Sequence, residues 1–181
     1  MLREESLYGN EITNTARITK MNMILADDGH SNIHMKDSLA NPVDGKTSYI
    51  DERGQLKNNG YDVVITNMPY SQKTKYGNLY DLPSANGDSI CVQHCIKAVN
   101  CAANNGRIAL VVPEGFLFRK DLAKVREYML ENCQLQSIIS FIFYFCVFFI
   151  SQRNHRKSKG NNYKRHNKGR IIKFAYTYSI A

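Results

Sequence analysis

The sequence lacks the features that mark several common protein classes. Its five cysteines include no C-x-x-C pair, so neither a zinc site nor a disulfide framework is indicated. Its longest apolar stretch, residues 138–150, is shorter than the roughly 20 residues that a membrane-spanning helix needs. The first ten residues contain no apolar segment of the signal-peptide type. We therefore expect a cytoplasmic protein with reduced thiols, no metal and no membrane partner; a membrane anchor before a basic tail is the less favoured alternative.

Acidic residues are absent from the C-terminal part of the chain. Residues 151–181 contain nine Lys and Arg and no Asp or Glu, whereas residues 1–150 contain 15 basic and 16 acidic residues. A formal net charge of +8 ordinarily favours an anionic partner such as nucleic acid. Here the whole excess belongs to the tail, so the rest of the chain gives no such indication.

Short apolar runs alternate with segments of helical periodicity along residues 11–140. The clearest strand is residues 61–66, where Val63-Val64-Ile65 is continuously apolar and β-branched, as in a parallel strand buried on both faces. The alternation predicts an α/β fold with a largely parallel sheet. We expect the first helix to face the sheet with Ile12, Ala16, Met23 and Ile24. Further strands are predicted over residues 32–35, 107–112 and 135–140, and helices over 11–27, 89–103 and 120–132.

The pattern changes after residue 140. Residues 141–150 are wholly apolar, residues 151–170 are almost entirely basic, polar or glycine, and residues 171–181 are again apolar and aromatic. Neither half of the tail after residue 150 has amphipathic periodicity, so we expect this sequence not to complete the sheet. The sequence therefore predicts a domain over residues 1–140 and a tail over 141–181 that is frameshifted or disordered.

A polar tetrapeptide, Asn67-Met68-Pro69-Tyr70, follows the clearest strand. Ligands of open α/β sheets bind at the carboxyl ends of the strands. The Asn67 amide oxygen and the Met68 carbonyl are two acceptors suited to an exocyclic amino group. Pro69 restricts the residue before it, and the ring of Tyr70 can stack on a base. The tetrapeptide is a candidate site for chemistry on an amine; by itself it also fits an ordinary strand-ending turn.

Several segments over residues 8–140 together resemble one known family. They occur in one order and at compatible spacings, and they are Tyr8-Gly9-Asn10-Glu11, residues 15–25, residues 33–39, Asp62 to Tyr70, Asn86-Gly87-Asp88, Gln93-His94 and Val111 to Arg119. This set resembles the methylation subunit of type I restriction–modification systems, which makes N6-methyladenine in DNA. The resemblance implies a partial Rossmann-like methyltransferase sheet with helices on both faces. It also implies S-adenosylmethionine as co-substrate, no metal, and double-stranded DNA with specificity and restriction subunits as partners.

The resemblance gives individual residues roles. It implies that Glu11 accepts hydrogen bonds from the cofactor ribose and that Asp37 contacts the cofactor adenine. Asn67 and the Met68 carbonyl would receive the target amino group, and Tyr70 would stack on the flipped-out base. Taken alone, Glu11 could equally be a carboxylate at a helix start and Asp37 a surface turn residue. Lys73 and Lys75 would lie near DNA or simply be solvated, and His94 is expected to have only a packing or hydrogen-bonding role.

Two departures from the family pattern bear on activity. Met68 stands where the family usually has a second proline, which predicts a looser pocket and slower chemistry. Only ten residues precede Glu11, too few for the glycine-rich strand and loop that hold the cofactor. We therefore expect a truncated internal fragment, without the central strand, that binds S-adenosylmethionine poorly. The alternative function is a catalytically inactive remnant that acts as a subunit-interaction module; a less favoured one is methylation of a protein glutamine or an RNA base.

Overall fold

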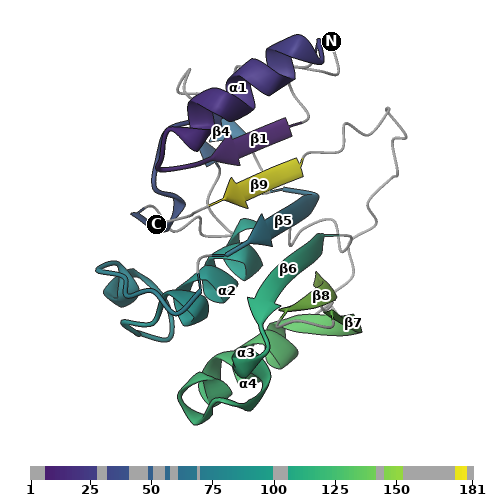
Figure 1. Ribbon diagram of the computed structural model, residues 1–181. Coiled ribbons are helices and arrows are strands. Elements are labelled where there is room, and N and C mark those ends of the chain that lie inside the picture. Colours follow the sequence, from purple (N-terminus) through teal and green to yellow (C-terminus); the bar gives the residue numbers. More distant parts are fainter. Residues whose placement is uncertain are drawn as a thin grey trace.

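A computed structural model describes residues 7–27, 32–40, 49–50, 56–57, 61–68, 70–99, 106–141, 145–152 and 174–178. Seven strands form one sheet in the order β2-β1-β9-β5-β6-β8-β7, as Figure 1 shows for most of them. All run in the same direction except β8, which is antiparallel to both of its neighbours. The strands are β1 (Leu7–Asn10), β2 (Ile33–His34), β5 (Val63–Asn67), β6 (Arg107–Pro113), β7 (Cys133–Phe141), β8 (Phe145–Gln152) and β9 (Phe174–Tyr178). A separate antiparallel pair joins β3 (Tyr49–Ile50) and β4 (Leu56–Lys57).

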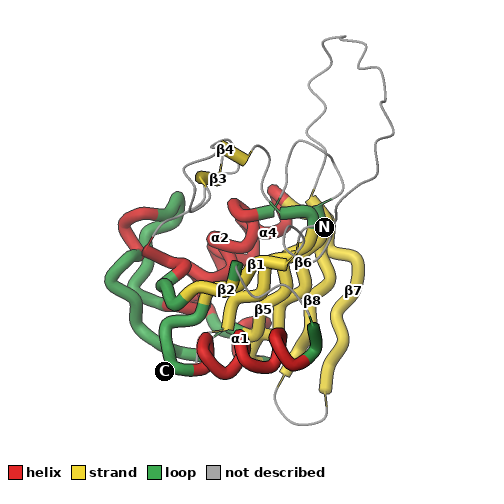
Figure 2. The backbone as a smooth tube through the Cα atoms, turned by 90° about the horizontal axis from the view of Figure 1, so that it is seen from above, coloured by secondary structure: helices red, strands yellow, loops and turns green. Residues whose placement is uncertain are grey.

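Helices cover both faces of the sheet, which confirms the expected α/β class. Figure 2 shows α1 (Thr15–Leu25) on one face, and α2 (Gly87–Ala98) and α4 (Ala123–Asn132) on the other. Short helical turns connect these elements at η1 (Ser38–Ala40), η2 (Gly77–Leu79), α3 (Gly115–Phe118) and η3 (Lys120–Leu122). The predicted helices and strands before residue 140 all exist, with ends shifted by up to five residues.

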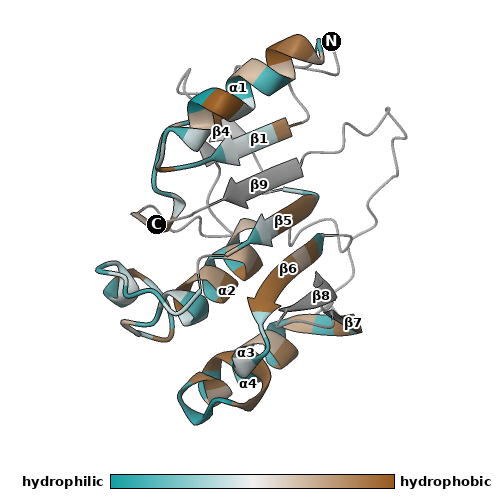
Figure 3. Cartoon of the chain, in the orientation of Figure 1, coloured by the Kyte–Doolittle hydropathy of each residue, from teal (hydrophilic) through white to brown (hydrophobic). Residues whose placement is uncertain are grey.

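The core lies between the sheet, mainly β5 and β6, and the helices α2 and α4 that cover one of its faces. Alternate residues of β6, namely Ile108, Leu110 and Val112, are buried, and Phe116 just after β6 is fully buried. Nearly every residue of α2 is buried. The hydropathy colouring in Figure 3 shows how apolar β5 and β6 are. This packing holds the carboxyl ends of β5 and β6, and the start of α2, in fixed relative positions.

Helix α1 packs against the sheet differently from the sequence prediction. Only Ala16 is buried on this helix, and Ile12 and Ile24 are exposed, so the expectation that these two residues face the sheet is wrong. Apolar residues occur on several sides of α1, and Leu25 is 83% exposed. Periodicity could not identify the packed side because no single apolar stripe stands out.

The prediction that residues after 140 do not complete the sheet is wrong for two segments. Strand β8 lies between β6 and β7, and β9 is an inner strand between β1 and β5, parallel to both. Amphipathic periodicity was the wrong test, because a strand that pairs with a neighbour on each side need not alternate apolar and polar residues. The position between β1 and β5 is occupied by β9, and the expected absence of the glycine-rich strand and loop before Glu11 stays a prediction. Residues 153–173 lie outside the described residues, and the frameshift and the boundary at residue 140 stay predictions.

Candidate active site at the carboxyl edge of the sheet

The predicted site residues lie at one edge of the sheet. Glu11 directly follows β1, Asp37 follows β2 by three residues, and Asn67 is the last residue of β5. These strands are parallel, so their carboxyl ends share an edge. Because β9 separates β1 from β5, Glu11 and Asn67 follow the two strands that flank β9.

Glu11 is buried, and only one of its two carboxylate oxygens accepts hydrogen bonds within the described residues. Its Oε1 accepts hydrogen bonds from the Thr13 backbone N–H at 2.9 Å and from Thr13 Oγ1 at 2.8 Å. Its Oε2 is buried and has no hydrogen-bond partner within the described part of the chain. A buried carboxylate oxygen without a donor is rare, because leaving it unsatisfied costs free energy. The arrangement therefore suits a ligand that brings a hydroxyl donor.

Asp37 has a local structural role in this structure. Its Oδ1 accepts a hydrogen bond from the Leu39 backbone N–H at 3.0 Å, which stabilises the turn that begins η1. This contact matches the turn interpretation that the sequence left open.

Within the tetrapeptide at the end of β5, Met68 is 2% exposed and lies in the core, whereas Asn67 lies at the carboxyl end of the strand and is half-buried. The Tyr70 hydroxyl donates a hydrogen bond to Asn67 Oδ1. The predicted acceptor is therefore engaged by the tyrosine that was expected to stack on a base. Pro69 lies outside the described residues.

The segment after Tyr70 folds back onto α2. The Tyr80 hydroxyl donates to the Leu39 carbonyl at 3.1 Å, and His94 Nδ1 lies 3.0 Å from the same hydroxyl oxygen. Burial lowers the pKa of His94 to about 4, so the ring is neutral at physiological pH. His94 thus has the packing and hydrogen-bonding role that the sequence suggested. Lys73 and Lys75 are exposed, and Lys75 Nζ lies 5.2 Å from the centroid of a neighbouring tyrosine ring.

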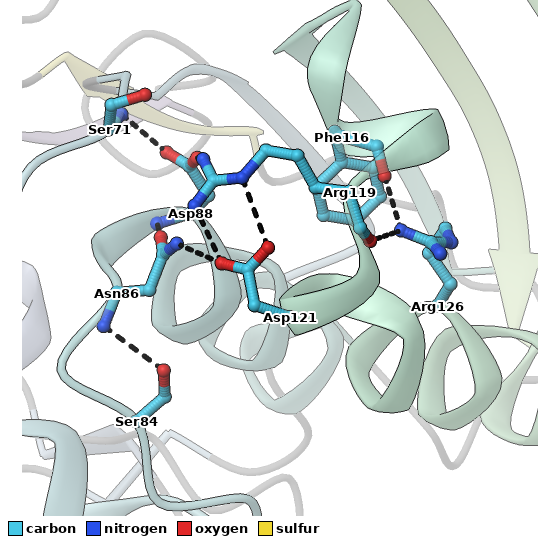
Figure 4. Close-up of polar contacts among 8 residues, drawn as sticks. All are labelled: Ser71, Ser84, Asn86, Asp88, Phe116, Arg119, Asp121 and Arg126. Atoms are coloured by element: carbon cyan, nitrogen blue, oxygen red, sulfur yellow. Dashed lines mark hydrogen bonds and ion pairs between the residues drawn. The ribbon is translucent and has the colours of Figure 1, made fainter.

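One group of charged residues beside the tetrapeptide received no individual role from the sequence. Asp88, in the first turn of α2, is fully buried and lies 3.5 Å from Arg119. Burial raises the pKa of the Asp88 carboxyl, although the Ser71 N–H and Arg119 act against the shift. Figure 4 shows how these residues join three segments of the chain. The Asn-Gly-Asp sequence before an apolar helix signals a capped helix start, but nothing in it indicates burial of the carboxylate.

Comparison with known proteins identifies the family. The profile of the family described as N-6 DNA Methylase matches residues 2–147. The chain belongs to the N-6 DNA methylase family. This membership fits the order of the sequence segments that resemble a type I methylation subunit. No match was found among curated proteins.

Two solved structures resemble this family member. The first belongs to a type I restriction–modification system, with a TM-score of 0.62 and 19% identity over 96% of this chain and 33% of the other. It supports the Rossmann-like fold, and the present chain spans about a third of its length. The second is a putative class I S-adenosylmethionine-dependent methyltransferase from Listeria monocytogenes, with a TM-score of 0.49 and 11% identity over 97% of this chain and 60% of that one.

The described residues of this methylase family member also bear on metal binding and on membrane insertion. No group of three or more His, Cys, Asp or Glu side chains there could hold a metal ion. No helix in the same residues has the length and apolar character to cross a membrane. Cys91, Cys95 and Cys133 are buried and do not form disulfides.

Proposed function

We propose that this chain carries the catalytic site of an adenine-specific DNA methyltransferase. The proposed reaction transfers a methyl group from S-adenosylmethionine to the exocyclic N6 of an adenine flipped out of duplex DNA. One observation carries the proposal: in a member of the N-6 DNA methylase family, a buried carboxylate with an open oxygen and an amide acceptor share the carboxyl edge of the sheet. Double-stranded DNA and the specificity and restriction subunits of a type I system are the proposed partners, and a cytoplasmic location follows.

Glu11 is the residue best suited to hold the co-substrate. Its open Oε2 can accept a hydrogen bond from a ribose hydroxyl, while Thr13 fixes the other oxygen in place. Asp37, on the neighbouring loop, is assigned to the adenine end of the same molecule. S-adenosylmethionine supplies the methyl group, which is attached to a positively charged sulfur.

The tetrapeptide is assigned to the target base. The Asn67 amide oxygen and the Met68 carbonyl accept the two amino hydrogens, which directs the nitrogen lone pair toward the methyl carbon. The new N–C bond forms as the S–C bond breaks, and the nitrogen then loses one proton. Before the base enters, the Tyr70 hydroxyl must leave Asn67, which frees the amide oxygen and the ring together. Positioning supplies most of the rate in such a displacement.

A second candidate function is an inactive subunit-interaction module. Asn67 Oδ1 accepts a hydrogen bond from the Tyr70 hydroxyl, and Asp37 Oδ1 accepts one from the Leu39 backbone N–H. Two of the acceptors assigned to the substrates are therefore engaged within the chain, which favours weak binding of both substrates.

Methyl transfer from labelled S-adenosylmethionine to unmethylated plasmid DNA tests the proposed function. We expect N6-methyladenine as the product, and a loss of about 100-fold or more in kcat for Asn67→Ala, by analogy with removal of one polar group from a preorganised site. Asn22→Ala, an exposed position on α1, is the matched control and should keep the parent rate. Absence of methyl transfer by the parent chain favours the interaction module instead.

Calorimetric titration with S-adenosylmethionine separates the two candidates at the binding step. Glu11→Gln should weaken binding by about 10-fold or more, since a hydrogen bond to a charged group contributes about 1.5–3 kcal/mol. Glu127→Gln, the same change at an exposed position of α4, should not alter binding. If Glu11→Gln binds as tightly as the parent, the ribose role of Glu11 is wrong.

A further inference from the structure

We infer that Asp88 is a positioning residue that holds the catalytic tetrapeptide in its working conformation. Asp88 lies on α2, outside the tetrapeptide, and touches neither substrate in the proposed reaction. The catalytic role of the tetrapeptide rests on the proposed function. The structural part of the inference concerns only the backbone that follows Tyr70.

The chain leaves Tyr70 through an unusual backbone conformation. Ser71 has a φ of 54°, in the left-handed region that residues other than glycine seldom adopt. Such conformations persist only where the surroundings fix them. Here the Ser71 N–H donates to Asp88 Oδ1 at 2.9 Å. The bond joins the residue after the tetrapeptide directly to the first turn of α2.

The next two residues are fixed to the same helix start. The Gly87 N–H donates to the Gln72 carbonyl at 2.7 Å, and Lys73 forms an isolated β-bridge with Asn86. A Cβ added at Gly87 would lie 2.9 Å from the Gln72 carbonyl oxygen, so this approach depends on glycine. The segment after Tyr70 therefore follows the position of α2 closely.

Asp88 is itself held by a closed ring of polar contacts (Figure 4). Its backbone N–H donates to Asn86 Oδ1 at 2.9 Å, and its Oδ2 lies 3.5 Å from Arg119 Nη1. Arg119 pairs with Asp121 through contacts of 2.6 and 3.1 Å. Asp121 in turn accepts a hydrogen bond from Asn86 Nδ2 at 3.3 Å, which closes the ring. The carboxylate that receives the Ser71 N–H thus has little freedom to move.

A second basic residue fixes the arginine end of the ring. Arg126 Nη1 on α4 donates to the Phe116 carbonyl at 2.7 Å and to the Arg119 carbonyl at 2.9 Å. The backbone that carries Arg119 is therefore anchored to α4 and, through buried Phe116, to the core. Asp88 connects the end of β5, the start of α2 and the segment after β6 at a single carboxylate.

Amide hydrogen exchange of Ser71, measured by NMR on the whole chain, tests the structural part. Asp88→Ala should raise the exchange rate of this amide by about tenfold or more, the effect of losing a hydrogen bond to a charged acceptor. Asp88→Ser should do the same, because serine suits a helix start but its hydroxyl is one bond too short to reach Ser71. Asp88→Asn keeps an acceptor oxygen and should protect Ser71 within about threefold of the parent.

Methyl-transfer kinetics on the same variants test the link to the tetrapeptide. Asp88→Ala and Asp88→Ser should lower kcat by about 10- to 100-fold with KM for S-adenosylmethionine nearly unchanged, because misplaced groups slow the chemical step. Asp88→Asn should restore most of kcat, and Glu131→Gln, at an exposed carboxylate of α4 outside the ring, should behave as the parent. If the parent transfers no methyl group, the proposed function fails, while the exchange of Ser71 still decides whether Asp88 holds the loop. Unchanged Ser71 exchange in Asp88→Ala, or equal damage in Asp88→Asn, overturns the inference.

Discussion

The buried His94 should make the stability of the protein depend steeply on pH. Its ring is enclosed by α2 and the segment that carries Tyr80, and burial lowers its pKa to about 4 from an ordinary value of 6.5. Below pH 6.5 the unfolded chain takes up a proton at this position while the folded chain does not. The stabilisation is therefore fully present above pH 6.5 and is lost as the pH falls from 6.5 toward 4.

The size of this loss follows from the two pKa values. Proton linkage at a single site gives a loss of about 1.4 kcal/mol at pH 5.5 and about 2.5 kcal/mol at pH 4.5, relative to pH 7.5. The loss is a substantial share of the 5–15 kcal/mol that is typical for a folded domain. His94→Gln removes the titrating group and should flatten the pH dependence by these amounts.

The Tyr80 hydroxyl adds a structural reason why protonation is unfavourable. It donates its only hydrogen to the Leu39 carbonyl, so His94 Nδ1 must donate to the hydroxyl oxygen and carry the proton of the neutral ring. A second proton would then fall on Nε2, and a positive charge on this ring, which is only 7% exposed, is disfavoured by burial.

Urea unfolding at pH 7.5, 6.5, 5.5 and 4.5 is the appropriate assay, with the parent and the variant compared at each pH. The comparison removes contributions from other groups, including Asp88, whose raised pKa acts in the opposite direction with pH. His34→Gln, the same substitution at a half-buried position of β2, is the control. If the difference between the parent and His94→Gln is constant from pH 7.5 to 4.5, the reasoning from burial is refuted.

Three other substitutions test the packing and the tetrapeptide. Phe116→Ala should lower the free energy of unfolding by about 3–5 kcal/mol because the ring is fully buried, whereas Phe118→Ala, at a position 71% exposed, should change it by about 0.5 kcal/mol or less. Gly77→Ala should destabilise the loop after Tyr70, because the new Cβ would lie 1.8 Å from a carbonyl oxygen. Gly115→Ala, where the new Cβ would have its nearest contact at 3.4 Å, is the control. Urea unfolding measures the stability of both variants. Met68→Pro should raise kcat for methyl transfer while lowering stability by about 2 kcal/mol or more, since the methionine is buried; equal single-turnover rates for variant and parent would contradict this.

The sequence supports prediction best where local pattern and burial coincide. Strands β5 and β6 follow from continuous apolar runs, although Ile65 of β5 is 41% exposed and the strand is therefore not buried on both faces as predicted. The polar residues after β5 indicate the carboxyl end at which ligands bind. Asn67 does lie at the end of β5, as expected, whereas the strand before Glu11 was not predicted. The buried oxygen of Glu11 and the contact between Tyr70 and Asn67 could not be foreseen, because each depends on side-chain conformation.

The wrong predictions for the segments that form β8 and β9 have a different cause. Strands β8 and β9 have no local signal that separates an inner strand from unrelated apolar sequence, and their positions depend on partners distant in the chain. The role inferred for Asp88 also depends on three distant segments that meet at one carboxylate. Such pairings are set by tertiary packing, which neither propensity nor periodicity describes.

The position of β9 between β1 and β5 has a consequence for how the sheet assembles. Strands β1 and β5 each pair with β9 and not with each other, so no ladder joins the two parts of the sheet until the segment 174–178 is available. During synthesis on a ribosome, β5, β6 and α2 emerge long before their inner partner. Partners more than 160 residues apart, as β1 and β9 are, close a long loop and fold slowly. Until then the inner edges of β1 and β5 are open to strands of other chains, a state that chaperones would have to shield.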